Sequence, residues 1–142
     1  MLAAILLSLV LTSLTAFVHY EALSRLNDAL PRIRVVARRA KVLVAVAGAF
    51  CSHASHIALF ASAYYLLRDR FGLGIFGGQF QDVFSAYLYF SAETYTSLGL
   101  GDIFPLGPLR MLAGVEALTG LLMISWSASF TYLEMSRFWK GR

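Results

Sequence analysis

The chain has 142 residues and a formal net charge of +4; 58% of the residues are hydrophobic and only 14% are charged. A soluble domain carries about 25% charged residues, so this composition excludes a disordered tail, a basic nucleic-acid-binding domain and most soluble enzymes. The one cysteine, Cys51, cannot form an intrachain disulfide or a multi-thiol zinc site. The length allows a single domain, and its apolar excess predicts contact with lipid.

Three stretches are long and apolar enough to be membrane spans. A helix rises about 1.5 Å per residue, so crossing a hydrocarbon layer of about 30 Å takes roughly 20 apolar residues. The stretches are residues 1–18, 42–67 and 109–133. A signal peptide is an alternative for the first stretch. However, no basic residue precedes Leu2 and no small-x-small cleavage site follows Val18, so we expect a retained transmembrane helix.

The basic residues are concentrated on one side of these spans. The connection between the first and second spans carries Arg25, Arg32, Arg34, Arg38, Arg39 and Lys41, and more basic residues lie in the tail of residues 134–142. Short cytoplasmic loops are rich in Lys and Arg. We therefore predict a multi-pass protein of the cell membrane with its N-terminus outside and its C-terminus in the cytoplasm.

Residues 19–41 form a basic segment with apolar residues at steps of three and four, namely Leu23, Leu26, Leu30 and Ile33. This pattern is typical of a helix that lies in the cytoplasmic interface and binds anionic lipid headgroups. The alternative is a solvated basic loop that only sets the topology.

The segment between the second and third spans is too apolar for an ordinary exposed loop. Residues 68–81 form its first part, which we expect to be an extracellular loop. Gly72, Gly74 and Gly77 have the spacing of a dinucleotide-binding fingerprint. That fingerprint needs a preceding strand and a following βαβ unit, and here a membrane helix precedes it, so nucleotide binding is not expected.

Residues 82–96 predict a helix of about 20 Å, too short to cross the bilayer. They lead into residues 97–102, where glycines alternate with other residues. Irregular backbone at membrane depth is tolerated only where protein buries it or where it lines a wet cavity. Glycines at alternate positions allow the left-handed dihedral angles that turn successive carbonyls to one side. This arrangement is typical of a filter that replaces the water around a cation, and it needs several copies of the chain around an axis.

Residues 89–102, YFSAETYTSLGLGD, closely resemble the pore signature of potassium channels, particularly small bacterial two-helix channels. The matching residues are Tyr89, Phe90, Ser91, Glu93, Thr94, Thr96, Gly99, Gly101 and Asp102. The resemblance implies an all-α membrane protein with three transmembrane helices, a re-entrant pore helix and a selectivity-filter loop. It also implies a prokaryotic homotetramer that conducts K⁺ passively, with no enzymatic step, no cofactor and no nucleic-acid partner.

The resemblance assigns roles to individual residues. The filter would be Ser97, Leu98, Gly99, Leu100 and Gly101, with K⁺ at the first four. The supporting residues would be Glu93, Thr94, Thr96 and Asp102, with Glu93 close to Asp102 and a proton or water shared between them.

The filter departs from the family pattern at three positions. Ser97 stands in place of threonine, Leu98 in place of valine, and Leu100 in place of tyrosine or phenylalanine. The missing ring at Leu100 leaves a weakly selective monovalent cation channel as one alternative. A non-conducting accessory or structural membrane subunit is another.

The third span would be the inner, pore-lining helix. Gly120 is its candidate hinge, because glycine weakens a helix locally, although close packing against a neighbouring helix explains it equally well. Glu116 is costly in a membrane unless it pairs with Arg110 or bonds polar groups behind the filter.

His53 and His56 lie on one face of the second span. Two histidines are too few ligands for a metal site, so we expect His53, His56 and Glu116 to form hydrogen bonds between helices. Proton sensing is the alternative, since histidine titrates near neutral pH.

Overall fold

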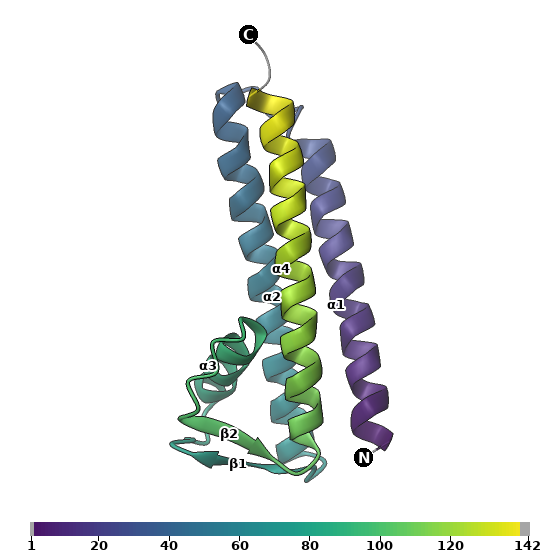
Figure 1. Cartoon of the computed structure of the whole chain (residues 1–142), viewed down its shortest axis with the longest axis vertical. Coiled ribbons are helices and arrows are strands. Elements are labelled where there is room, and N and C mark those ends of the chain that lie inside the picture. The colour runs from purple at the N-terminus through teal and green to yellow at the C-terminus, as the bar shows by residue number, and fades with distance from the viewer. Residues whose placement is uncertain (1, 140–142) are drawn as a thin grey trace.

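Three long helices form the body of the molecule. The computed structural model describes residues 2–139, and within them α1 (Leu2–Ala29), α2 (Lys41–Asp69) and α4 (Leu109–Trp139) run alongside one another (Figure 1). These three are the helices in the described part of the chain that are long and apolar enough to cross a membrane. Leu9, Phe17, Phe50 and Leu122 are among the apolar side chains that they leave exposed. The architecture is that of the predicted all-α membrane protein.

The first helix is longer than predicted. We expected a helix over residues 1–18 and a separate interfacial segment over residues 19–41, but α1 continues without a break to Ala29. The residues after Val18 contain neither Gly nor Pro until Pro31, so nothing in the local chemistry stops the helix. The prediction of a separate segment starting at residue 19 was therefore wrong.

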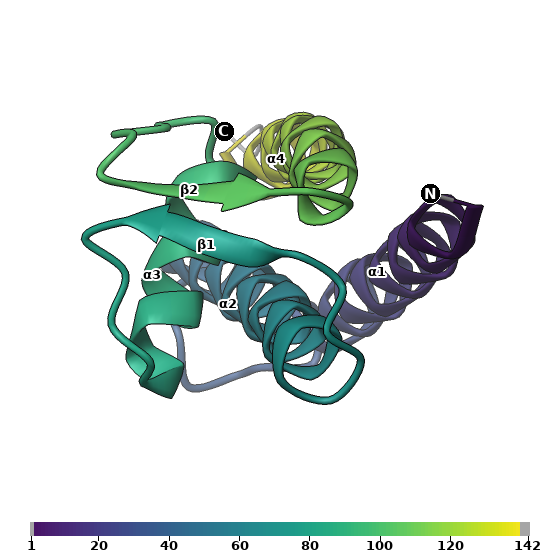
Figure 2. The same cartoon turned by 90° about the horizontal axis from the view of Figure 1, so that it is seen from below.

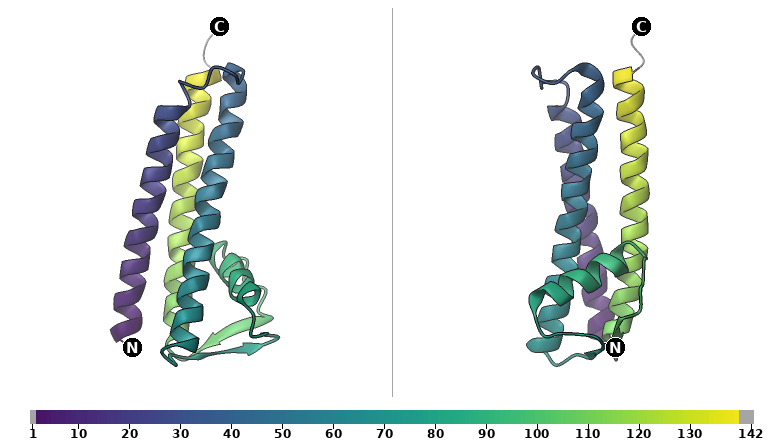
Figure 3. Two further views of the ribbon diagram at one scale, coloured as in Figure 1. Left: turned by 180° about the vertical axis from the view of Figure 1, so that it is seen from behind. Right: turned by 90° about the vertical axis from the view of Figure 1, so that its left-hand side faces the viewer.

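The connection from α1 to α2 is short and closely packed at its ends. It contains a 3₁₀ turn over Arg38–Ala40, and the Lys41 Nζ donates to the Pro31 carbonyl at 3.2 Å. Leu30 is fully buried and packs in a small cluster with Val42 and Phe138. The connection thus lies at the same end of the bundle as the C-terminal end of α4 (Figure 3).

The other helices also extend past their predicted limits. The outer helix, predicted over residues 42–67, is α2, and it ends at Asp69. The inner helix, predicted over residues 109–133, is α4, and it ends at Trp139. Most of the predicted tail of residues 134–142 is therefore helical, because Phe138 and Glu134 pack against the bundle. Residues 140–142 lie outside the described part.

A two-stranded sheet, which the sequence pattern did not predict, closes one end of the bundle. Strand β1 (Ile75–Gly78) pairs antiparallel with β2 (Ile103–Leu106), so the predicted loop over residues 68–81 is partly a strand. The strands come very close at Gly78, where an added Cβ would lie 2.1 Å from the Asp102 carbonyl oxygen. Only glycine fits there, which explains part of the glycine-rich run.

The predicted short helix over residues 82–96 is present as α3 (Phe84–Tyr95), which slants against α2 and α4 above the sheet (Figure 1). Its buried face joins the main hydrophobic core, where the rings of Tyr64 and Phe90 meet edge to face at 5.1 Å and Phe76 of β1 lies 4.9 Å from Phe90. Helix α1 packs on the side of the bundle away from α3, as the end-on view in Figure 2 shows. The core therefore holds α3 at a fixed angle.

Candidate functional site

The glycine-alternating segment follows α3 directly and returns to β2. Ser97 to Gly101 are all exposed in the single chain, and Leu98 and Leu100 are 64% and 61% exposed. Such apolar exposure inside a membrane protein marks a surface that meets something else.

The backbone N–H groups of this segment are directed at α3. Ser97 donates to the Thr94 carbonyl at 3.0 Å, and Leu98 and Gly99 both donate to the Glu93 carbonyl, at 2.8 and 3.2 Å. Leu100 donates to the Glu93 side chain, at Oε2, over 3.1 Å. The end of α3 therefore supplies the acceptors for four successive N–H groups.

This bonding determines the direction of the carbonyls. The chain has no cis peptide bond in its described residues, and in a trans peptide the C=O lies opposite the N–H. The carbonyl oxygens of residues 96–99 consequently point away from α3. Positive φ angles recur at Ser97 (58°), Gly99 (55°) and Gly101 (80°), with Leu98 and Leu100 between them at negative φ. Serine in this region costs about 1–2 kcal/mol, so the surroundings of Ser97 hold it in a strained conformation.

Glu93 and Asp102 support opposite parts of the segment, and no hydrogen bond joins them among the described residues. Glu93 is buried and bonds Leu100, whereas the Tyr89 hydroxyl donates to Asp102 Oδ2 at 3.0 Å. Burial and the charge of Asp102 raise the pKa of Glu93, against the opposing effect of the Leu100 N–H. Each carboxylate thus has its own bond to the surrounding protein, and the proton or water shared between Glu93 and Asp102 stays a prediction.

The remaining predicted support residues act through local bonds. The Thr96 hydroxyl donates to the Ala92 carbonyl at 2.8 Å, and Thr94 contributes its carbonyl to Ser97. Both bonds close the C-terminal turn of α3.

Glu116 is fully buried between α4, α2 and α3, and its partners are hydroxyl groups rather than Arg110. The Tyr64 hydroxyl donates to Glu116 Oε2 at 2.6 Å, and Ser91 Oγ lies 2.5 Å from Oε1 and 2.9 Å from the Ile57 carbonyl. A serine hydroxyl has one proton and cannot donate to both oxygens. Both contacts are satisfied when Glu116 is protonated and donates to Ser91, which fits the absence of a cation partner in residues 2–139.

Gly120 lies where α4 passes the end of α3. An added Cβ would lie 1.9 Å from the Tyr95 carbonyl oxygen, and α4 is continuous through this residue. The geometry supports close packing as the reason for glycine here, and a hinge role stays a prediction.

His53 and His56 do lie together, and His19 of α1 joins them. The ring centroids of His53 and His56 are 5.9 Å apart, and that of His19 is 5.2 and 5.3 Å from them. His19 was missed because it fell in the segment predicted to lie outside the membrane. Its position within a continuous apolar helix was the signal that could have found it.

Three hydroxyl groups connect the three imidazoles into a closed ring of hydrogen bonds. Ser127 joins His53 (2.9 Å) to His19 (3.2 Å), Ser52 joins His19 (3.1 Å) to His56 (3.5 Å), and Tyr95 joins His56 to His53 (2.9 Å each). Three neutral imidazoles and three hydroxyls supply six protons, one for each bond. The ring connects α1, α2 and α4 to the last residue of α3.

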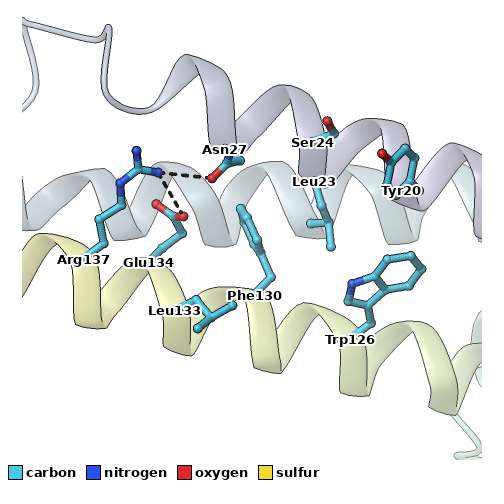
Figure 4. A pocket seen from close by; sticks show the side chains of 9 residues that line it. All are labelled: Tyr20, Leu23, Ser24, Asn27, Trp126, Phe130, Leu133, Glu134 and Arg137. Carbon is cyan, nitrogen blue, oxygen red and sulfur yellow. Dashed lines mark hydrogen bonds and ion pairs between the residues drawn. The ribbon is translucent and has the colours of Figure 1, made fainter.

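A cavity of about 380 Å³ lies farther along the groove between α1 and α4 (Figure 4). At one end of it Arg137 donates to Asn27 Oδ1 at 3.2 Å and pairs with Glu134 at 3.6 Å. These contacts join the C-terminal parts of α1 and α4.

Comparisons with known proteins point to the same part of the chain. A family model described as "Ion channel" matches residues 52–135, more than half of the sequence. The inward rectifier potassium channel Kirbac3.1 of Paramagnetospirillum magnetotacticum is 37% identical over 81 residues, which is 56% of this chain and 26% of that protein. The chain thus matches about a quarter of the length of this relative. No solved structure matches the chain.

Proposed function

Because this chain belongs to the ion channel family, we propose that it conducts K⁺ passively through a homotetrameric pore lined by the Ser97–Gly101 segment. The chain is accordingly a membrane transport protein. In this proposal K⁺ is the transported ion, and transport requires no cofactor.

The observation that carries the proposal is the direction of the peptide groups after α3. Glu93 and Thr94 accept the N–H groups of four successive residues, which leaves the attached carbonyl oxygens pointing away from α3. A row of carbonyl oxygens from each of several copies is what replaces the hydration shell of K⁺ in a filter. K⁺ would be held by carbonyls of Ser97, Leu98, Gly99 and Leu100.

Two further features support this assignment. The partly negative C-terminal end of α3 leads directly into the exposed Ser97–Gly101 segment, and the C-terminal end of a helix favours a cation nearby. In addition, the similar Kirbac3.1 protein is named as a potassium channel. Selection of K⁺ over Na⁺ would rest on the bonds that hold the segment, from Glu93 to Leu100 and from Tyr89 to Asp102.

A tetramer would account for the exposed leucines. Leu98 and Leu100 carry apolar side chains that a neighbouring copy would cover, because closed symmetric rings bury such patches. One chain supplies a single strand of the filter, so conduction requires this assembly.

We further propose that the filter end faces the outside of the cell membrane. The opposite end carries the exposed residues Arg32, Arg34, Arg38 and Arg39, close to Arg137 of α4 (Figure 3). Clustered arginines of this kind remain in the cytoplasm and attract anionic lipid headgroups.

The test is K⁺ flux from liposomes that contain the purified full chain. We expect flux that Ba²⁺ blocks and a reversal potential close to that of K⁺ when K⁺ faces Na⁺. Gly99→Ala should reduce the flux at least about ten-fold, because alanine disfavours the left-handed conformation that the filter needs. A reversal potential near zero would instead support the weakly selective cation channel.

Gly72→Ala is the matched control. Gly72 also has a left-handed φ of 59° with no heavy atom within 4 Å of an added Cβ, but it lies outside the filter. The two substitutions strain the backbone equally, so equal flux from both variants would contradict the assignment of the filter.

A further inference from the structure

The three histidines of the chain converge on one point between the long helices. The sequence contains His19, His53 and His56, and one ring nitrogen from each lies within 4.8 Å of the other two. His19 and His56 are 0% and 1% exposed. They come from different helices, since His19 is on α1 and the other two are on α2, so the cluster is a product of helix packing.

This arrangement fits the requirements of a transition-metal ion. Zn²⁺ binds imidazole nitrogens at about 2.0–2.1 Å, and three such ligands leave a fourth tetrahedral position open. Nitrogens around a tetrahedral ion lie about 3.3 Å apart, so small side-chain movements would bring the three together. Imidazole suits Zn²⁺, Co²⁺ and Ni²⁺, whereas Mg²⁺ and Ca²⁺ prefer oxygen ligands.

The hydroxyl groups around the cluster complete the site. A histidine that binds a metal donates its other ring N–H to a nearby acceptor, which sets the orientation of the imidazole. Every ring nitrogen here already faces the hydroxyl of Ser52, Ser127 or Tyr95. Whichever nitrogen of each ring binds the ion, the other nitrogen therefore retains an acceptor.

We propose that His19, His53 and His56 bind one divalent transition-metal ion of the Zn²⁺ class per chain. The fourth position is open to water or to the Tyr95 hydroxyl. Bound metal links α1 to α2 beside the last residue of α3, which is the residue that also touches Gly120. The first helix is thereby connected to the segment that supports the filter.

The site rests on the histidine geometry alone and not on the proposed K⁺ conduction. Metal binding is measured without any flux, so a protein that binds Zn²⁺ but does not conduct would contradict only the proposed function. A conducting protein that does not bind metal would contradict only the metal site.

The experiment uses the full chain in detergent, treated with a chelator and then dialysed. Titration with Co²⁺ should show one ion per chain with the visible absorption of a tetrahedral site, and Zn²⁺ should displace it. Each of His19→Asn, His53→Asn and His56→Asn should weaken binding at least about ten-fold, since a single outer partner of a metal ligand already changes affinity by 10–100-fold.

Two control variants separate metal ligation from general effects. Cys51→Ser removes the one thiol of the chain, which is exposed and outside the cluster, and it should leave binding unchanged. Ser52→Ala removes one hydroxyl but keeps all three imidazoles, so it should still bind one Co²⁺ with a lower affinity. Loss of binding in the cysteine variant would overturn the proposal.

X-ray absorption of the wild-type protein with bound Zn²⁺ identifies the metal ligands directly. This measurement tests the site even if a histidine variant does not fold. We expect three imidazole ligands and no sulfur in the first shell. Binding without a defined stoichiometry, a shell with fewer than three imidazoles, or unchanged binding in a folded His19→Asn variant would each refute the site.

Discussion

The backbone of Gly120 on α4 lies directly against the carbonyl of Tyr95 at the end of α3. A Cβ on Gly120 would lie 1.9 Å from that oxygen, so no other residue fits without moving a helix. Helices α4 and α3 therefore meet backbone to backbone at the level of the histidine ring. This contact joins α4 to the last residue of α3.

Gly120→Ala should destabilise the protein by about 1–3 kcal/mol, because the added methyl group forces α4 away from α3. Thermal unfolding in detergent measures the effect. Gly114→Ala is the control on the same helix, since an added Cβ there meets no atom within 4 Å. That variant should be neutral or up to about 1 kcal/mol more stable, because alanine favours a helix. Wild-type stability of Gly120→Ala combined with altered opening of the pore would instead support a hinge.

Glu116→Gln should retain nearly full stability, whereas Glu116→Ala should not. A neutral glutamine can accept from Tyr64 and donate to Ser91, as a protonated glutamate does. Alanine leaves the buried Tyr64 hydroxyl without its partner, at about 1–3 kcal/mol, whereas Ser91 keeps its bond to the Ile57 carbonyl. Thermal unfolding of both variants measures this difference.

Glu21→Gln is the control for the loss of a carboxylate in a helix. Glu21 forms an exposed pair with Arg25, and such pairs contribute about 0–1 kcal/mol. If Glu116→Gln were as unstable as Glu116→Ala, the buried carboxyl would have to be charged in the folded protein.

Asp82 should make stability depend on pH in the acidic range. The Arg68 guanidinium, which bonds Asp82 Oδ1 and the Tyr87 hydroxyl, lowers the pKa of the Asp82 carboxyl. A lowered folded-state pKa means that the stabilisation is complete above the unfolded value of about 3.9 and is lost as the pH falls through the folded value. The difference in melting temperature between wild type and Asp82→Asn should thus be constant above about pH 5 and shrink below about pH 4.

Asp28→Asn is the matched control for this prediction. Asp28 is an exposed aspartate that has no salt bridge in the part of the chain that the structure describes. Because no ion pair is lost there, subtracting the Asp28→Asn difference from the Asp82→Asn difference isolates the contribution of the pair of Asp82 with Arg68. An Asp82→Asn difference that grows at acidic pH would contradict the assigned ion pair.

Features set by nearest neighbours in the chain could be predicted well. The three long apolar stretches became α1, α2 and α4, and the short stretch before the glycines became α3. Helix limits were less accurate, because they depend on whether the next residues find a surface to pack on. Leu30 and Phe138 pack in the same buried cluster, and they lie beyond the ends predicted for the first and third spans at residues 18 and 133.

Contacts between distant residues could not be predicted in the same way. The pairing of Gly78 with Ile103 depends on residues 96–102 returning the chain from the end of α3 to the end of the bundle where β1 lies. The resemblance placed Glu93 near Asp102 but did not predict the bonds of Glu93 to Leu100 and of Tyr89 to Asp102.

The amino-acid sequence by itself determined that this chain enters a membrane as helices and carries a filter-like segment, because hydropathy, helix length and glycine spacing are local properties. Only the tertiary structure decided that His19 meets His53 and His56, and that the carboxyl of Glu116 is bonded to hydroxyl groups. These arrangements depend on the rotation and tilt of the packed helices. Contacts along the whole length of each helix determine that rotation and tilt, so no single stretch of sequence encodes them.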